Sequence, residues 1–177
     1  MLPELLEILD TEARERLRRY LGCLGRWSPR INLTGAEDAE TAFATLIAPV
    51  LGAENFLTGK VVDVGSGNGS PGLVLSALRR ELPFLLLEPR AKRWAFLREA
   101  AREMGASNVE VVRLRSDQAR DLGADTITLR AVGLDPSALR PLLAPGGRVL
   151  IFGGPPLPGW ERWTLPSGAQ LQRRCFT

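Results

Sequence analysis

The sequence predicts an α/β fold: a doubly wound, mostly parallel sheet preceded by an N-terminal helical extension. Three observations support this. Short apolar segments alternate with stretches of helical periodicity from residue 61 onward, and a glycine-rich turn follows the first of them. Upstream of residue 55, apolar residues keep a helical spacing and no segment is typical of a strand. Strands that alternate with helices favour βαβ units with right-handed crossovers.

The N-terminal extension is expected to contain two helices. Apolar residues lie three or four positions apart in the first part of the chain: Leu2, Leu5, Leu6, Leu9, Ala13, Leu17, Tyr20, Leu21 and Leu24. This spacing predicts one amphipathic helix. We expect Ser28-Pro29 to break it, and a second helix to run from about Ala39 to Leu51 with an interruption near Pro49.

The remaining chain predicts alternating strands and helices. The expected strands are Val61–Val64, Phe84–Leu87, Val109–Val112, Thr126–Leu129 and Arg148–Phe152. The expected helices are Gly72–Glu81, Ala91–Met104 and Pro136–Leu143. The tail, Gly153–Thr177, is expected to add one or two antiparallel strands at the edge of the sheet. We therefore divide the chain into an extension, residues 1–55, and a ligand-binding domain, residues 56–177.

The composition excludes several kinds of site. The chain has 177 residues, 45% hydrophobic and 24% charged, as in an ordinary globular protein. It has no histidine, and Cys23 and Cys175 are its only cysteines. A zinc site, a disulfide framework and a Ser-His-Asp triad are therefore not expected, and we expect no metal. The net charge of +3 permits a nucleic-acid partner without requiring one.

The N-terminal sequence favours a cytoplasmic protein. MLPELLEILD carries acidic residues where a signal peptide requires positive charge. No apolar run approaches the roughly 20 residues that span a membrane, so we expect no membrane association.

The glycine-rich loop between Val64 and Leu73 predicts a cofactor site. In an open α/β sheet, ligands bind beyond the carboxyl ends of the strands, where glycines let the backbone approach a ligand. The spacing Gly67-x-Gly69-x-x-Gly72 fits a dinucleotide loop, whereas Asp63, Gly65 and Gly67 fit the D-x-G-x-G loop of S-adenosylmethionine (SAM) enzymes. A third reading, a glycine turn without a ligand, also remains open.

Two acidic residues favour SAM in a Rossmann-like domain. Asp63 precedes the loop, where a carboxylate would serve a pyrophosphate poorly but could reach the ammonium of a methionine moiety, directly or through water. Asp117 follows the third strand, at a position that commonly meets adenine in SAM domains. Glu88 ends the second strand and is expected to accept both ribose hydroxyls, a role that would serve NAD equally.

With these residues placed, the chain resembles the small-subunit (16S) ribosomal RNA guanine-N7 methyltransferases, the RsmG or GidB family, over roughly residues 17–154. Ile31-Asn32-Leu33-Thr34 is similar to the family's N-L-T segment, and Asp63–Gly72 to its D-V-G-T-G-x-G-F-P-G loop. Leu86–Leu97 resembles L-L-D-S-x-x-K-R-x-x-F-L. Arg130-Ala131 and Leu143–Arg148 resemble the family's S-R-A and L-K-P-G-G-R.

The resemblance implies a class I SAM methyltransferase that acts on ribosomal RNA or the small ribosomal subunit. We expect the protein to be a monomer. It implies that Gly65, Gly67 and Ser70 line the cofactor loop and that Ser116 and Asp117 meet the adenine. It also implies that Arg130 lies at the mouth of the active site, and that the following residues meet RNA phosphates: Arg90, Lys92 and Arg93. Trp27 and Trp94 lie in helical apolar patterns and are expected in the core.

Two segments depart from the family pattern. Thr45–Val50 replaces R-H-x-x-D-S, and Gly153 replaces the lysine of K-G after the fifth strand. Two alternatives therefore stay open: a SAM methyltransferase with another substrate, and a non-catalytic SAM- or RNA-binding paralogue. Guanine N7 carries a lone pair and no proton, so its methylation needs no general base, and the absence of histidine agrees with this reaction.

Overall fold

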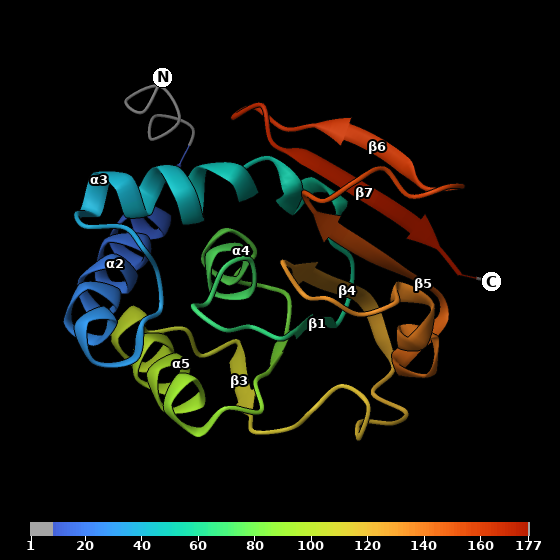
Figure 1. Ribbon diagram of the computed structural model, residues 1–177, viewed down its shortest axis with the longest axis horizontal. Coiled ribbons are helices and arrows are strands. Elements are labelled where there is room, and N and C mark those ends of the chain that lie inside the picture. Colours follow the sequence, from blue (N-terminus) through green and yellow to red (C-terminus); the bar gives the residue numbers. More distant parts are fainter. Residues whose placement is uncertain (1–8, 177) are drawn as a thin grey trace.

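The computed structural model describes residues 9–176 and contains one seven-stranded sheet (Figure 1). The order of the strands in the sheet is β3-β2-β1-β4-β5-β7-β6. Their bounds are β1 Val61–Val64, β2 Phe84–Leu87, β3 Val109–Val112, β4 Ala124–Arg130, β5 Leu143–Phe152, β6 Glu161–Thr164 and β7 Gln170–Cys175. The predicted apolar positions Leu2, Leu5 and Leu6 lie outside the described residues.

Five strands are parallel and two are antiparallel. β1 pairs with both β2 and β4 in parallel, so the chain reverses its direction of winding beside β1. β7 pairs antiparallel with β5, and β6 antiparallel with β7. The predicted doubly wound, mostly parallel sheet and the antiparallel edge formed by the tail are thus confirmed. The carboxyl ends of β1, β2 and β4 meet at one edge, which is where a ligand is expected.

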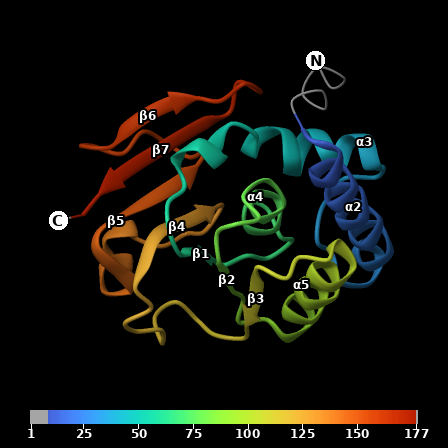
Figure 2. The ribbon, with the colours of Figure 1, turned by 180° about the vertical axis from the view of Figure 1, so that it is seen from behind.

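Different helices pack on the two faces of the sheet. Helices α2 (Thr11–Ile31), α4 (Gly72–Leu78) and α5 (Ala91–Met104) pack together on one face, as Figures 1 and 2 show. The other face is covered by the 3-10 helix η4 (Pro136–Leu142), which buries Leu139 and Leu142 against strand residues. The central strands β1, β2 and β4 bury both of their faces, in agreement with the apolar runs in their sequences, whereas β3 at the edge is only half-buried.

Helix α2 continues past Pro29, contrary to the predicted break. It begins at the cap Asp10, whose carboxylate accepts a hydrogen bond from Ala13 N at 2.7 Å, and it ends at Asn32 with φ 48°. Pro29 lies in the last turn, so it removes only one backbone hydrogen bond. Ile31, two residues further on, still packs against the core, which favours continuing the helix.

The second predicted helix has the expected extent but changes type along its length. It consists of α3 (Ala39–Ala42), the π-helix η1 (Phe43–Ile47) and the 3-10 helix η2 (Ala48–Val50). A further 3-10 turn, η3 (Ala53–Phe56), brings the chain beside the β6–β7 hairpin (Figures 1 and 2). Phe56 packs there edge-on against Trp163, with ring centroids 4.9 Å apart. This segment therefore links the extension to the last strands.

Within residues 9–176, no helix is long and apolar enough to cross a membrane. The same residues contain no group of three or more His, Cys, Asp or Glu side chains that could hold a metal ion.

Candidate cofactor site

The glycine loop connects the carboxyl end of β1 to the first turn of α4. Gly65, Gly67 and Gly69 all have positive φ angles, of 70°, 51° and 96°. Gly72 is required for a different reason: a Cβ there would lie 2.6 Å from Asp63 Oδ2. The sequence folds into a tight loop because glycine alone adopts these angles freely and permits this approach.

Asp63 lies behind the loop and is completely buried. Thr128 Oγ1, on the neighbouring β4, donates a hydrogen bond of 2.6 Å to Asp63 Oδ1. Oδ2 faces the N-terminus of α4 without a hydrogen bond of standard geometry. Burial raises the pKa of Asp63 to about 6, and the hydrogen bond from Thr128 opposes this effect. The carboxylate of Asp63 thus packs closely against Gly72, and its contact with a methionine ammonium stays a prediction.

Glu88 and the loop meet as the sequence predicts. Glu88 follows β2 and is 3% exposed. Its Oε2 accepts a hydrogen bond from Gly67 N at 2.9 Å, and its Oε1 accepts one from Arg90 N at 2.8 Å. Each carboxylate oxygen can accept a second hydrogen bond, so ribose hydroxyls could still bind here.

A pocket of about 320 Å³ opens beside the loop. Its polar lining residues are Arg115, Ser116 and Asp117. Most of the others are apolar and include Val64, Leu87, Leu114, Val132, Leu134 and Leu139. Asp117 is exposed and forms an ion pair with Arg115 at 2.9 Å, which lowers the pKa of the aspartate. An apolar slot with few polar groups suits a flat ring such as adenine, so these residues fit the nucleoside part of SAM.

Arg130 joins the sheet to the extension. It ends β4, where Nη1 donates to Ser70 Oγ at 2.8 Å and Nη2 donates to the carbonyl oxygen of Thr45 at 2.6 Å. Ser70 Oγ in turn donates to the carbonyl oxygen of Leu46 at 2.6 Å. Burial lowers the pKa of Arg130. The predicted site residues Ser70 and Arg130 are therefore in direct contact.

Two residues near the loop were not predicted as part of the site. Tyr20 of α2 is fully buried and donates from its hydroxyl to the carbonyl oxygen of Asn68 at 2.8 Å. Its apolar spacing predicted only a core role. Thr128 donates a hydrogen bond to Asp63. The sequence does carry a signal for this role: Thr128 is a polar residue within an apolar strand, and a buried polar side chain needs a hydrogen-bond partner.

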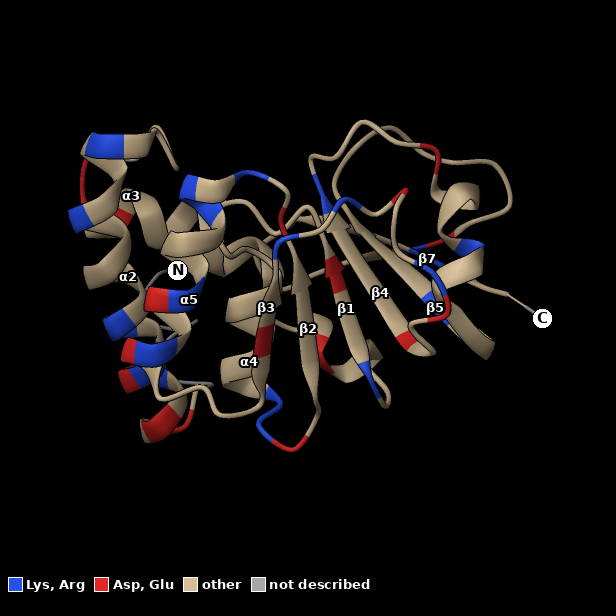
Figure 3. Cartoon of the chain, turned by 90° about the horizontal axis from the view of Figure 1, so that it is seen from below, with Lys and Arg blue, Asp and Glu red and all other residues tan. Residues whose placement is uncertain are grey.

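The predicted phosphate-contacting residues lie at the same edge. Arg90 and Lys92 are exposed, and Arg93 Nη1 would lie 3.7 Å from a Cβ at Gly67. Figure 3 shows Lys and Arg in the loops beyond the carboxyl ends of β2 and β4. By contrast, Trp27 packs on Phe96 and Trp94 donates from Nε1 to the Val111 carbonyl oxygen. Both tryptophans are half-buried, so they lie at the margin of the fold and not in the core where they were expected.

The fold and the loop define a SAM-dependent methyltransferase of class I. A solved SAM-dependent methyltransferase from Aquifex aeolicus is similar, with a TM-score of 0.57 at 16% identity over 77% of this chain and 93% of that one. An RNA methyltransferase from Salinibacter ruber, solved with S-adenosyl-L-homocysteine, has a TM-score of 0.50 at 27% identity over 66% of this chain and 80% of that one.

The chain belongs to the family described as rRNA small subunit methyltransferase G, which matches residues 13–155. Relatives named ribosomal RNA small subunit methyltransferase G include one from Halorhodospira halophila, 38% identical over 82% of this chain and 72% of its own length. One from Methylococcus capsulatus is 35% identical over 96% and 85%. One from Neisseria meningitidis is 38% identical over 71% of this chain and 61% of its own length. The predicted family and the predicted cofactor class are confirmed.

Proposed function

We propose that this chain transfers a methyl group from SAM to N7 of a guanine in small-subunit ribosomal RNA, in the cytoplasm and as a monomer. The observation that carries the proposal is the meeting of the glycine loop with Glu88 beside an apolar pocket. Membership of a family named for ribosomal RNA methylation supports the choice of substrate.

The cofactor supplies an electrophilic methyl group, so the protein has mainly to bind and orient both reactants. Gly65 and Gly67 would allow close approach of the cofactor, Glu88 would hold its ribose, and Ser116 with Asp117 would meet its adenine. Asp63 would attract the ammonium group of the cofactor's methionine moiety, directly or through water. No residue has to remove a proton from N7.

RNA would approach the same edge of the sheet. Arg90, Lys92 and Arg93 have no ion-pair partner among residues 9–176, which leaves their charge available for phosphates. Arg130, at the mouth, would orient the acceptor or the loop rather than exchange a proton, because a guanidinium stays charged near neutral pH.

Calorimetric titration with S-adenosylhomocysteine, with NADH as the control ligand, tests the cofactor. We expect saturable binding of the former alone. The variant Gly67→Val should abolish it, because a β-branched side chain is strained at φ 51° and would fill the loop. Gly105→Val is the matched control: it carries similar strain at φ 66°, but its Cβ has open space at the end of α5.

Transfer of tritiated methyl to isolated small ribosomal subunits tests the substrate. The subunits should come from a strain that lacks its own member of this family. Binding of S-adenosylhomocysteine without transfer to these subunits would favour another substrate. Binding of RNA without any methyl transfer would favour the non-catalytic alternative. Normal cofactor binding by Gly67→Val would refute the placement of the cofactor.

A further inference from the structure

A second pocket lies beside the candidate cofactor pocket, at the carboxyl ends of β4 and β5. Its volume is about 630 Å³, within the range of ligand sites. The segment Val132–Leu134 lines both pockets, and Arg130 lies at the border of the second. The next residue, Ala131, has a φ of 53°, an uncommon conformation for a residue other than glycine. The second pocket is therefore where a molecule would meet the reactive end of a ligand in the first.

The outer wall of this pocket is the segment Gly153–Leu157, called here the acceptor loop. Its sequence, Gly-Gly-Pro-Pro-Leu, offers little for holding a shape, because the prolines lack N–H donors and the glycines are flexible. Gly153 and Gly154 have positive φ angles of 74° and 79°. Only one backbone hydrogen bond, from Gly153 N to the Gln170 carbonyl oxygen at 2.8 Å, ties the loop to β7.

The side chain of Gln172 supplies the missing contacts. Its Nε2 donates to the carbonyl oxygens of Gly153 and Pro155, at 3.1 and 3.0 Å. Its Oε1 accepts from Leu157 N at 2.9 Å. The residue is 2% exposed, so both amide protons and the amide oxygen are committed to three backbone groups of one loop.

The buried amide of Gln172 determines the shape of the acceptor loop. It is not needed for β7 to pair in the sheet, because that pairing uses only the backbone. Nor is it needed to fill space, because an apolar side chain would do so without the cost of burying an amide. A buried amide whose three groups are all paired instead fixes the path of the loop. The pocket behind it offers apolar surface from Leu129, Ile151 and Phe152, with the guanidinium of Arg130 at its edge. Those surfaces suit the faces of a planar ring.

We propose that the second pocket receives the acceptor nucleobase, a purine of the RNA turned out of its stack, and that Gln172 is the positioning residue that holds the pocket open. This inference rests on the proposed function. It assigns a role to the C-terminal strand β7, which lies beyond the family match at residues 13–155. Gln172 also lines the second pocket, but its amide groups are all bound to the acceptor loop, so it acts by holding that loop in place.

The test uses the full chain with Gln172→Glu and Gln172→Asn. The first places a carboxylate against two carbonyl oxygens, and the second keeps the amide but is one methylene too short. We expect kcat/KM for small ribosomal subunits to fall roughly tenfold or more, as for the loss of one or two hydrogen bonds. The dissociation constant for S-adenosylhomocysteine should stay within about twofold, because the first pocket does not include the acceptor loop.

Gln170→Glu is the matched control, since Gln170 lies on the same strand but is exposed and contacts only Thr164 and Gly168 with its amide nitrogen. Its kinetics should equal those of the wild type. Hydrogen exchange at the Leu157 amide should be faster in both Gln172 variants, which reports on the loop without reference to activity.

The outcomes separate the two proposals. A wild-type protein that transfers no methyl group to small ribosomal subunits would contradict the proposed function. An active wild type with unchanged kcat/KM in Gln172→Glu and Gln172→Asn would overturn the role of Gln172. Loss of S-adenosylhomocysteine binding in parallel with activity would also overturn it, because Gln172 would then support the fold as a whole.

Discussion

At the scale of single residues, the carboxyl group of Asp63 couples stability to pH. Its pKa is raised by burial to about 6, above the 3.8 of the unfolded chain. An acid whose pKa is higher in the folded state favours folding while it is protonated. That contribution is complete below pH 4 and is lost as pH rises through 6. When the group is ionised, the free energy of unfolding is lower by about 3 kcal/mol than when it is protonated.

Asp63→Asn should remove this dependence. We expect the free energy of unfolding of the wild type, minus that of the variant, to fall by about 2 kcal/mol between pH 4.5 and 7.5. Urea denaturation at several pH values measures it. Asp38→Asn is the control, because Asp38 accepts from Thr41 N and its pKa is lowered. The wild-type advantage over that variant should be lost as pH falls below 4. A difference for Asp63→Asn that is constant with pH would show that the carboxyl is ionised throughout.

The sequence predicts which residues gather at the site better than what each of them contacts. Gly67 and Glu88 meet because both follow parallel strands whose ends share an edge, and this follows from topology alone. The partner of Asp63 is Thr128, 65 residues away, and no local spacing indicates that pair. Likewise, Arg130 binds the carbonyl oxygen of Thr45, in a segment where the family motif had been lost and no role was expected.

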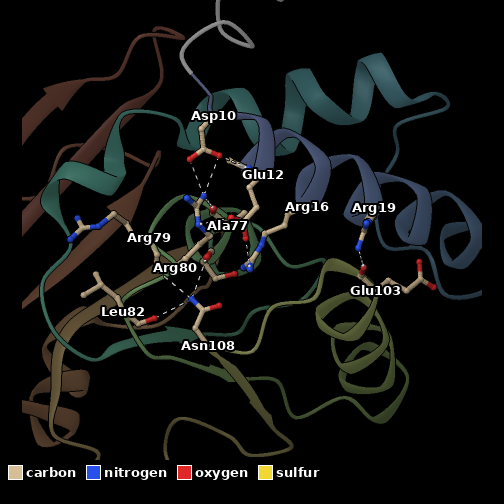
Figure 4. Close-up of polar contacts among 12 residues, drawn as sticks. Asp10, Glu12, Arg16, Arg19, Ala77, Arg79, Arg80, Leu82, Glu103 and Asn108 are labelled. Carbon is tan, nitrogen blue, oxygen red and sulfur yellow. Dashed lines mark hydrogen bonds and ion pairs between the residues drawn. The ribbon is translucent and has the colours of Figure 1, made fainter.

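At the scale of elements, Asn108 ends helix α4. The helix stops at Leu78 instead of the predicted Glu81. The Nδ2 atom of Asn108 donates to the carbonyl oxygen of Ser76 at 3.3 Å. It also donates to those of Arg79 and Leu82, at 3.4 and 3.1 Å (Figure 4). These carbonyls belong to the end of the helix and the turn after it, where intrahelical donors are missing. A side chain just before β3 thus caps the end of this helix.

Asn108→Asp should destabilise the protein by roughly 2 to 3 kcal/mol, because a carboxylate would face three carbonyl oxygens in a half-buried place. Thermal or urea unfolding measures the loss. Asn55→Asp is the matched control, since Asn55 is exposed and donates only to the Gly52 carbonyl oxygen at 3.3 Å. It should change stability by less than about 0.5 kcal/mol. Equal effects of the two substitutions would argue against the cap.

The bounds of the short strands and of helix α5 are the most predictable feature of the fold. β1, β2, β3 and α5 match the predicted ranges, because apolar runs and helical spacing leave little freedom in their placement. The errors fall at the ends. β5 begins at Leu143 rather than Arg148, since Ala124 pairs with Leu143 before a bulge carries the pairing on to Arg148. Propensity cannot foresee such pairing between distant segments.

At the scale of the whole molecule, one hydrophobic core joins the extension to the ligand-binding domain. Leu17, Tyr20 and Leu24 of α2 belong to the same buried cluster as Leu73 of α4 and Phe96 of α5. Polar contacts reinforce this packing near the loop, through Tyr20, and at the opposite end, where Arg80 pairs with Asp10 at 3.0 Å (Figure 4). The division of the chain at residue 55 stays a prediction. The shared core implies that the extension does not unfold by itself.

Leu24→Ala tests this cooperativity. Leu24 is 1% exposed, so its truncation should cost roughly 2 to 5 kcal/mol of unfolding free energy. If the molecule unfolds as one unit, urea transitions followed by far-ultraviolet circular dichroism and by tryptophan fluorescence should coincide and shift together. Fluorescence reports on both parts, because Trp27 lies in α2 and the other three tryptophans, Trp94, Trp160 and Trp163, lie in the rest of the chain. Leu21→Ala, at a half-buried position on the same helix, should shift both transitions by less. Separated transitions, of which Leu24→Ala shifts only one, would mean that the extension is an independent folding unit and that the cofactor loop can form without it.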